Sequence, residues 1–215
     1  MRDSENIRQV AALGVDWIGM VFWDQSPRNV TMIQSPAGII PDRSSMQDEQ
    51  CAMYDFKRVG VFVDEMAQNI ITRVVNFQLD LVQLHGHETP TLIRNLRRTL
   101  ATDIRPGIQF IKAISVESRD DIATYMEYED SVDYFLFDTK CPTAGGSGEQ
   151  FDWSILDAYD GDKPFLLSGG IGPDDADRIH AFNHPKCIGI DLNSRFETEP
   201  GMKDVEALAR FIKSL

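Results

Sequence analysis

The sequence is short of cysteine and of positive charge. Its three cysteines, Cys51, Cys141 and Cys187, are an odd number, widely spaced and without a CxxC pair. This pattern excludes a disulfide framework and a cysteine-based zinc site, and it favours a reducing compartment. With 34 acidic against 21 basic residues, the formal net charge is −13. Such a surface would repel nucleic-acid phosphates, so we expect no nucleic-acid partner.

Long hydrophobic runs are also missing. The longest, such as residues 17–23, fall well short of the roughly 20 residues that a membrane-spanning helix needs. Residues 1–6 contain no apolar core of a signal peptide. We therefore expect a cytoplasmic protein with no membrane partner. The 42% hydrophobic residues and the length of 215 suit one globular domain spanning residues 1–215.

Short apolar runs rich in Val, Ile and Phe recur along the chain and predict strands. Each run is nearly continuous in apolar residues, which is typical of strands covered on both faces. Segments with helical spacing lie between them, for example 4–13, 66–77 and 205–212. The seven predicted strands are 16–22, 58–63, 80–85, 109–114, 133–138, 163–168 and 187–191.

Alternating strands and helices indicate parallel pairing through right-handed crossovers. The unit length of about 25 to 30 residues is typical of a (β/α)8 TIM barrel, but the chain opens with a helix and is one strand short. Either the sheet is open and doubly wound, or the first β-strand of a barrel is missing from this chain. The polar stretch 34–56 interrupts the pattern, and we predict a short helix near 35–40 followed by an exposed loop.

Helix starts carry residues that favour capping. Ser4, Asp64 and Ser118 each precede a segment with helical spacing, and Pro173-Asp174 precedes Ala176. Side chains of this kind accept hydrogen bonds from the first N–H groups of a helix, while proline suits its first turn.

Glycine and polar residues gather where the predicted strands end. Ser168-Gly169-Gly170 leaves one strand and leads into a helix capped near Pro173, which makes a phosphate cradle of backbone N–H groups. The next strand ends at Asp191, and Asn193-Ser194 can add donors, as in barrels that bind phosphate after strands 7 and 8. The alternative is a tight turn with no ligand.

Three charged or titratable residues are candidates for the chemistry. Asp138 ends a buried strand, where desolvation favours a carboxyl that holds and delivers a proton; the alternative is a turn cap. His85 is either a ligand contact or a hydrogen-bonded structural group. Arg28 offers a planar fork for a carboxylate, or is a solvated loop charge.

A glycine-rich stretch, 143–148, follows Asp138 closely. It contains Gly146 and predicts either a lid over a ligand or a flexible connector. No GxGxxG pattern opens a helix after a first strand, so it is not a dinucleotide fingerprint.

Together these residues resemble the phosphoribosylanthranilate isomerase family of tryptophan biosynthesis. Any one motif is weak, but their ordered series runs from Met1 to the C-terminus. The motifs are Gly14-Val15-Asp16 leading into Phe22, Ser26-Pro27-Arg28, Val59-Gly60-Val61-Phe62-Val63, Val82-Gln83-Leu84-His85-Gly86, Asp138-Thr139, Gly145-Gly146-Ser147-Gly148 ahead of Phe151-Asp152-Trp153, Ser168-Gly169-Gly170-Ile171, Gly189-Ile190-Asp191 and Pro200-Gly201-Met202-Lys203-Asp204.

The resemblance implies an Amadori rearrangement on a (β/α)8 barrel with no metal or cofactor. N-(5-phosphoribosyl)anthranilate becomes 1-(2-carboxyphenylamino)-1-deoxyribulose 5-phosphate, and the residue matching Asp138 is the general acid. The only partner implied is the small phosphorylated substrate. The residues expected to bind it are Arg28 at its carboxylate, Gly169, Gly170, Asn193 and Ser194 at its phosphate, and His85, Gly146, Ser168 and Asp191 nearby.

Two departures from the family pattern stand out. Arg195 replaces a glycine of the family's phosphate loop, where it would crowd the loop or add a donor. The family's first strand ends in Lys-x-Cys-Gly, whose cysteine is the general base, and no such strand precedes Ser4. Cys141 is a poor substitute, because it follows a different strand.

Two expectations follow from the missing strand. The first is a start placed too late in the gene, with impaired activity in this chain. The second is that the strands at 16–22 and 187–191 present unpaired edges, through which the protein could self-associate.

Two alternatives remain beside the isomerase. One is another phosphate-binding barrel enzyme such as indole-glycerol-phosphate synthase, for which Lys112 at a strand end would be the lysine, although the motifs around it do not match. The other is a barrel that binds a phosphorylated ligand without catalysis.

Overall fold

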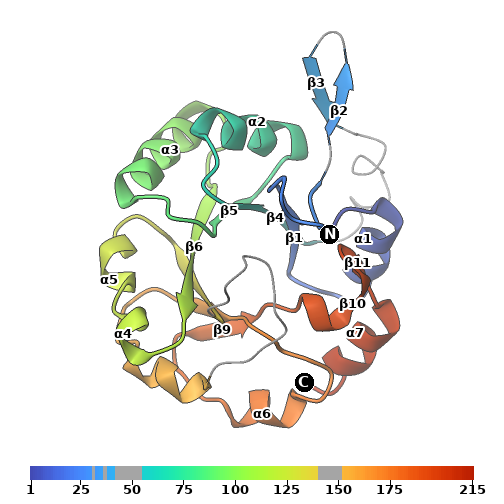
Figure 1. The fold of residues 1–215 in the computed structure, drawn as a ribbon, viewed down its shortest axis with the longest axis vertical. Coiled ribbons are helices and arrows are strands. Elements are labelled where there is room, and N and C mark those ends of the chain that lie inside the picture. The colour runs from blue at the N-terminus through green and yellow to red at the C-terminus, as the bar shows by residue number, and fades with distance from the viewer. Residues whose placement is uncertain (31, 36–37, 42–54, 140–151) are drawn as a thin grey trace.

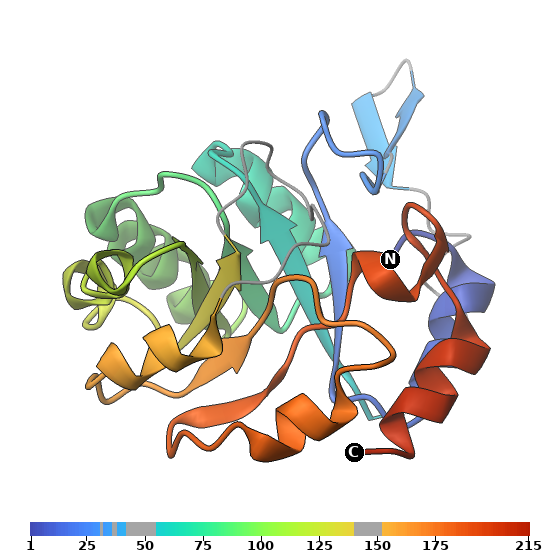
Figure 2. The ribbon, with the colours of Figure 1, turned by 60° about the horizontal axis from the view of Figure 1, so that its bottom comes forward.

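The computed structural model describes residues 1–30, 32–35, 38–41, 55–139 and 152–215. Seven parallel strands form one curled sheet whose order follows the chain (Figures 1 and 2). They are β1 (Trp17–Val21), β4 (Lys57–Phe62), β5 (Leu81–Leu84), β6 (Gln109–Val116), β7 (Tyr134–Thr139), β8 (Phe165–Leu167) and β9 (Cys187–Ile190). Each of the seven predicted strands is confirmed, with ends that differ by at most a few residues.

Helices connect the strands and lie around the outside of the sheet (Figure 1). Each crossover returns the chain to the same end of the sheet, as parallel pairing requires. The α-helices are α1 (Ser4–Ala11), α2 (Ala67–Phe77), α3 (Pro90–Asp103), α4 (Arg119–Ile122), α5 (Tyr125–Tyr128), α6 (Ala176–Ala181) and α7 (Val205–Ile212). Two 3-10 helices, η3 (Trp153–Ala158) and η4 (Ser194–Phe196), complete the set in the described residues.

The two faces of the sheet carry different cores. Alternate residues of the strands, including Leu81, Ile111 and Leu136, form a small cluster on the inner face of the curled sheet. Their neighbours in sequence point outward and join the larger cluster beneath the helices, which contains Phe110 and Phe137. Because side chains alternate along a strand, residues two positions apart share a face. Residues at an even spacing from Leu81, Ile111 or Leu136 on the same strand therefore face inward.

The expected caps match only in part. Ser118 caps α4 in a capping box with Asp121, as predicted. The N-cap of α1 is Asp3, one residue before Ser4, and its carboxylate accepts from the N–H of Asn6. Asp64 caps no helix: its backbone φ of +48° places it in the loop before α2, whose N-cap is Met66.

The predicted short helix near 35–40 is wrong. An antiparallel pair of strands, β2 (Met32–Ser35) and β3 (Gly38–Pro41), occupies this region, with Ser35 opposite Gly38. The β-branched residues Ile33, Ile39 and Ile40 favour strands, and Gly38 disfavours a helix, which accounts for the difference. The loop predicted after it lies largely outside the described residues.

Strands β1 and β9 are the two edges of the sheet in the described residues. The edge of β1 is contacted by the N-terminus, because the amine of Met1 donates a hydrogen bond to the carbonyl of Gly19. Helix α1 packs beside α7 and the hairpin of β10 (Glu197–Glu199) and β11 (Met202–Lys203). The Asn6 amide donates to the Lys203 carbonyl at 2.9 Å and accepts from its N–H at 2.7 Å, tying the first helix to this hairpin.

No helix in the described part of the chain is long and apolar enough to cross a membrane.

Candidate active site

Four of the predicted site residues share the inner face at the carboxyl ends of the strands. Asp138 follows Leu136 by two positions on β7, and His85 continues the inward parity of Leu81 from β5. Ser168 and Asp191 come directly after β8 and β9. They follow the paired residues Leu166 and Gly189 by two positions, so they face the same side of the sheet. In parallel barrels these strand ends carry the active site, so the sequence-based grouping of these residues is physically consistent.

Asp138 and His85 face each other across the strand ends. His85 Nε2 lies 3.3 Å from Asp138 Oδ2, and both side chains are largely withdrawn from solvent. On the other side of the ring, the amide nitrogen of Gln83 lies 3.3 Å from His85 Nδ1. The other Asp138 oxygen, Oδ1, accepts from the N–H of Thr139 at 2.9 Å. The carboxyl group is therefore held in one orientation, beside a ring that can exchange a proton with it.

Asp191 is a second carboxyl close to this pair. It accepts a hydrogen bond from the Ser168 hydroxyl at 3.2 Å. Burial raises the pKa of Asp191, Lys203 opposes that rise, and the negative charge of Asp138 adds to it. Two carboxyls in one site whose environments differ can hold different protonation states, as acid–base chemistry requires.

The glycine turn after β8 lies against β7. Gly169 and Gly170 adopt φ of +93° and +65°, in the left-handed region that favours glycine. A Cβ atom at Gly169 would lie 2.7 Å from the backbone nitrogen of Thr139, so only glycine allows this approach. The glycine turn thus contacts Thr139, the residue that follows Asp138 in the sequence.

The helix expected to be capped near Pro173 begins at Ala176, and its N-cap is two residues after Pro173. Helix α6 begins at Ala176 after the N-cap Asp175, whose carboxylate accepts from the N–H of Gly172 at 2.7 Å. The Gly172 N–H therefore has a carboxylate partner within its own loop. Any phosphate site here depends on the two left-handed glycines rather than on the N-terminus of α6.

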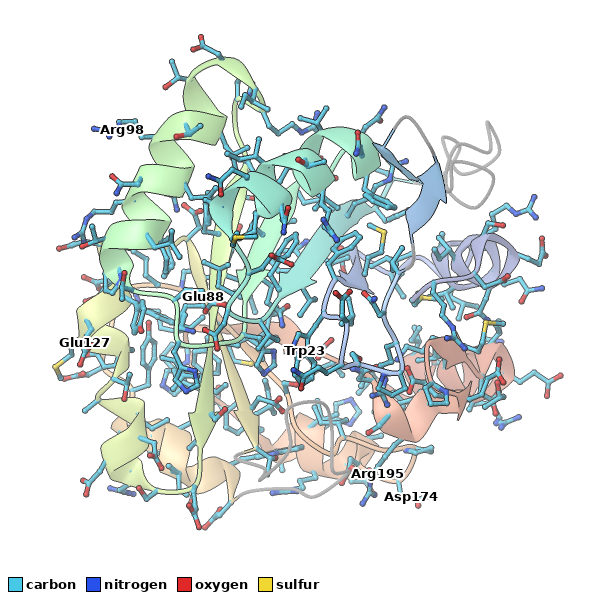
Figure 3. All side chains as sticks on the ribbon, turned by 45° about the horizontal axis from the view of Figure 1, so that its top comes forward. Trp23, Glu88, Arg98, Glu127, Asp174 and Arg195 are labelled. Carbon is cyan, nitrogen blue, oxygen red and sulfur yellow. The ribbon has the colours of Figure 1, made fainter. Side chains whose placement is uncertain are left out.

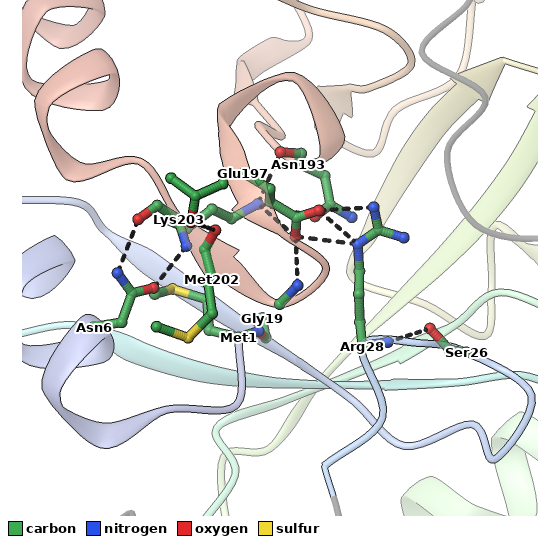
Figure 4. A network of polar contacts seen from close by, with 11 residues as sticks. Met1, Asn6, Gly19, Ser26, Arg28, Asn193, Glu197, Met202 and Lys203 are labelled. Carbon is green, nitrogen blue, oxygen red and sulfur yellow. Dashed lines mark hydrogen bonds and ion pairs between the residues drawn. The ribbon is translucent and has the colours of Figure 1, made fainter.

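Arg28 follows β1 and makes an ion pair that the sequence did not reveal. Its guanidinium donates from Nη2 to Glu197 Oε2 at 2.7 Å and from Nε to both carboxylate oxygens, at 2.9 and 3.1 Å (Figure 4). Its backbone N–H donates to the Ser26 hydroxyl at 3.1 Å. The fork is thus oriented and buried rather than solvated.

Asn193 and Ser194 follow β9, and η4 begins at Ser194. Lys203 Nζ donates to the backbone oxygen of Asn193 at 3.0 Å and to its side-chain oxygen at 2.9 Å. Arg195, labelled in Figure 3, is exposed. Its Cδ is 2.8 Å from where a Cβ of Gly172 would stand, two residues after the glycine turn. The arginine therefore packs on the backbone of this loop.

Lys112 does not belong to the inner face. It lies within β6, two positions after Phe110, and therefore points to the outer face of the sheet as Phe110 does. Its Nζ lies 3.1 Å from Glu88 Oε2. It also sits over the Tyr128 ring, 5.4 Å from the centroid. This position removes the lysine on which the indole-glycerol-phosphate synthase alternative depended, because β6 continues to Val116 and Lys112 does not end it.

Several expected positions cannot be compared with the structure. Gly146 and Cys141 lie outside the described residues. Cys187, the free cysteine among the described residues, is at the amino end of β9, away from the strand ends that carry Asp138. In the described ranges, no group of three or more His, Cys, Asp or Glu side chains could hold a metal ion.

Sequence reasoning missed Gln83, Glu197 and Lys203. Gln83 was detectable in principle, because it shares the parity of His85 two residues later. Glu197 and Arg28 are 169 residues apart, and no spacing rule connects them. Both Glu197 and Lys203 lie between the end of the predicted strand 187–191 and the last helix, and Lys203 is part of the motif Pro200-Gly201-Met202-Lys203-Asp204.

Comparison with known proteins identifies the family. The model of N-(5'phosphoribosyl)anthranilate (PRA) isomerase matches residues 2–214. The N-(5'-phosphoribosyl)anthranilate isomerase of Parabacteroides distasonis is 43% identical over 215 residues, which cover 100% of this chain and 90% of that protein. The enzyme of the same name from Phocaeicola vulgatus is 42% identical, with 100% and 94% covered.

Solved structures agree with these relatives. Phosphoribosyl anthranilate isomerase from Thermotoga maritima superposes with a TM-score of 0.75 at 29% identity, covering 100% of this chain and 94% of that one. A phosphoribosyl anthranilate isomerase in complex with reduced 1-(o-carboxyphenylamino)-1-deoxyribulose 5-phosphate gives 0.74 at 26% identity, with the same coverage.

Proposed function

The chain belongs to the N-(5'-phosphoribosyl)anthranilate isomerase family, and on that premise we propose how its own residues perform the reaction. The protein is an isomerase of tryptophan biosynthesis that converts N-(5'-phosphoribosyl)anthranilate to 1-(2-carboxyphenylamino)-1-deoxyribulose 5-phosphate. We take residues 1–215 as one barrel domain, and assign the chemistry to the carboxyl ends of its strands.

The reaction is an isomerisation that proceeds by proton transfers and needs no external oxidant or reductant. Asp138 donates a proton to the ribose ring oxygen as the bond from that oxygen to C1 breaks, and the anthranilate nitrogen forms a double bond to C1. A base then removes the proton from C2, and the electrons of that bond form a C1=C2 double bond while the nitrogen recovers its lone pair. The ketone forms when C1 gains a proton and the C2 hydroxyl loses one. His85, 3.3 Å from Asp138, is suited to re-supply the proton that Asp138 gives away.

The substrate carries a carboxylate at one end and a phosphate at the other, so the site needs a partner for an anion at each of its two ends. The Arg28 guanidinium, which Glu197 holds through its Nε and Nη2 atoms, is the cation proposed to attract the carboxylate of the anthranilate ring. The left-handed glycines Gly169 and Gly170, with Ser194 at the start of η4, match the phosphate through backbone and hydroxyl donors. Asp191 and Ser168 lie between these ends, beside the ribose.

The base at C2 is not assigned to a described residue. The described cysteine, Cys187, stands at the other end of its strand. The sequence-based reading assigns this proton to a cysteine on a strand ahead of Ser4, which the 215 residues do not contain.

The observation that carries the proposal is the position of Asp138, inward at the end of β7, beside His85 and one residue from the contact with Gly169. Replacing Asp138→Asn should abolish the conversion while binding is retained, because the side chain loses its acidic proton but keeps its shape. The measurement is the loss of anthranilate fluorescence as substrate is consumed.

A matched control is Asp133→Asn, next to the amino end of the same strand, where the carboxylate pairs with Arg97 at 2.7 Å. Its conversion rate per folded molecule should equal that of the parent chain. Equal rates in Asp138→Asn and the parent would contradict the assignment. If the parent binds the phosphorylated ligand but does not convert it, a non-catalytic binding barrel is the better description.

A further inference from the structure

The β10–β11 hairpin contributes two buried charges that the chemistry above does not use. The side chains of Glu197 and Lys203 are only 5% and 8% exposed. The hairpin lies outside the seven-stranded sheet, between the end of β9 and helix α7. Buried charges on such a small element need an explanation, because their desolvation is costly.

Glu197 is organised around Arg28. Its two oxygens receive three hydrogen bonds from the Arg28 Nε and Nη2 atoms, which fixes the plane of the guanidinium (Figure 4). The backbone N–H of Gly201, at the turn of the hairpin, donates to Glu197 Oε1 at 3.1 Å. The carboxylate is thus held by its own hairpin while it holds the arginine.

Lys203 extends the same network to the opposite loop. Its Nζ lies 3.4 Å from Glu197 Oε1 and donates to both oxygens of Asn193. The hairpin therefore connects the loop after β1, which carries Arg28, with the loop after β9, which carries Asn193 and Ser194. These are the two loops assigned above to the carboxylate and the phosphate of the substrate.

Stability alone is a weak explanation for this arrangement. Buried ion pairs can often be replaced by apolar residues without loss of stability. A preorganised cation, in contrast, needs a counter-charge that holds its fork in place before the ligand arrives. Although burial would raise the pKa of Glu197, hydrogen bonds from Arg28 and the charge of Lys203 lower it below the ordinary value, so the carboxylate is ionised at neutral pH.

We propose that the β10–β11 hairpin sets the distance between the two ends of the substrate site, with Glu197 as the positioning residue for Arg28 and Lys203 as the positioning residue for the Asn193–Ser194 loop. This inference rests on the proposed function, because it takes the two loops as the carboxylate and phosphate sites. It predicts that each hairpin charge affects recognition of one end of the ligand.

The test uses two probes in equilibrium binding to the full chain. The reduced compound 1-(o-carboxyphenylamino)-1-deoxyribulose 5-phosphate carries both charged ends, and ribose 5-phosphate carries only the phosphate. Glu197→Gln should weaken the first probe by about 10- to 100-fold, the value of one or two charge-assisted hydrogen bonds, and change the second by less than about threefold. Lys203→Met should weaken both probes by about tenfold, because both depend on the phosphate loop.

Glu199→Gln is the matched control, since Glu199 is on the same strand with its side chain 64% exposed. It should bind both probes as the parent does. A double-mutant cycle decides whether Glu197 acts through Arg28: in an Arg28→Ala background, Glu197→Gln should cause no further loss of affinity. If Glu197→Gln does not fold, Glu197→Asp keeps the charge, shortens the reach, and should show the same selective loss.

The outcomes distinguish failure of this inference from failure of the proposed function on which it rests. Equal affinities in Glu197→Gln and Glu199→Gln, an equal loss for both probes, or an additive loss with Arg28→Ala would each overturn the inference while the proposed function stands. If the parent chain binds neither probe, the proposed function fails and the inference fails with it.

Discussion

At the scale of single residues, Gly169 shows how backbone conformation and a close approach act together. Gly169→Ala places a methyl group at φ +93° and against the backbone of Thr139, so it should push the glycine turn away from β7. We expect weaker binding of ribose 5-phosphate by about tenfold or more, and lower stability.

Gly107→Ala provides the matched control for this variant. Gly107 has a similar φ of +83°, but no described atom lies within 4 Å of the position of its Cβ. It should lose about 1 kcal/mol of stability and bind ribose 5-phosphate normally. Similar binding by both alanine variants would show that the turn is not part of the phosphate site.

The buried pair of Lys112 and Glu88 gives a second prediction. Lys112→Met leaves the Glu88 carboxylate without its cation in a position that is 3% exposed. The free energy of unfolding should fall by about 3 to 5 kcal/mol. Denaturation by urea measures this loss, with Lys186→Met as control, because the exposed Lys186–Asp162 pair should contribute less than about 1 kcal/mol. Losses of the same size in the two variants would refute a special role for the buried pair.

The sequence could identify residues whose role follows from their position on a strand. Asp138, His85, Ser168 and Asp191 were found because they end predicted strands, and the alternation of side chains then brings them to one face. The partners of Arg28 could not be found in this way. Its contact with Glu197 depends on how two distant loops fold against each other, and no local pattern encodes that approach.

At the scale of elements, the β10–β11 hairpin links charge to stability. The pKa of Glu197 is below its ordinary value of 4.5, so the folded state binds its proton more weakly than the unfolded chain. This contribution to stability is present above about pH 4.5 and is lost as the pH falls through the folded pKa. Asp191 acts in the opposite sense, because its raised pKa makes the folded state the stronger proton binder.

Comparison of the parent with Glu197→Gln isolates the glutamate, since Asp191, Lys203 and Arg28 are present in both. The variant should be less stable at pH 7, and the difference should shrink as the pH falls from 5 to 3. Urea denaturation across this range measures it. A difference that does not depend on pH would mean that Glu197 is not charged in the folded protein.

Elements differ in how well sequence patterns predict them. The seven sheet strands are buried on both faces, so their continuous apolar runs are unambiguous. The β2–β3 pair was missed because it is short, polar at its ends and next to proline and glycine, which suggested a turn or a single helical turn. The cap of α6 was expected near Pro173, because proline suits a first turn, whereas the N-cap is Asp175 and the helix begins at Ala176.

At the scale of the whole molecule, the parallel order of seven strands leaves β1 and β9 as edges in the described residues. An added N-terminal strand that ends in Lys-x-Cys-Gly should pair with both edges and supply the base at C2. We expect turnover to rise by about 10²- to 10⁴-fold, the usual value of one proton-transfer partner.

Two further measurements accompany that comparison. Sedimentation should detect self-association of the 215-residue chain at high concentration, and the extended chain should be monomeric under the same conditions, because covered edges no longer pair with neighbours. The same extension with alanine in place of cysteine should restore the monomer without the rate. If the cysteine and alanine versions turn over equally, the base lies elsewhere.

The reciprocal bonds between Asn6 and Lys203 also constrain how this protein matures on the ribosome. A helix that emerges among the first residues finds its docking surface only after some two hundred more have been synthesised. Until then its apolar side lacks the surface that covers it in the folded protein. A nascent chain stalled short of Lys203 would therefore lack the contacts of Lys203 with Asn193 and Glu197 that complete the network in Figure 4.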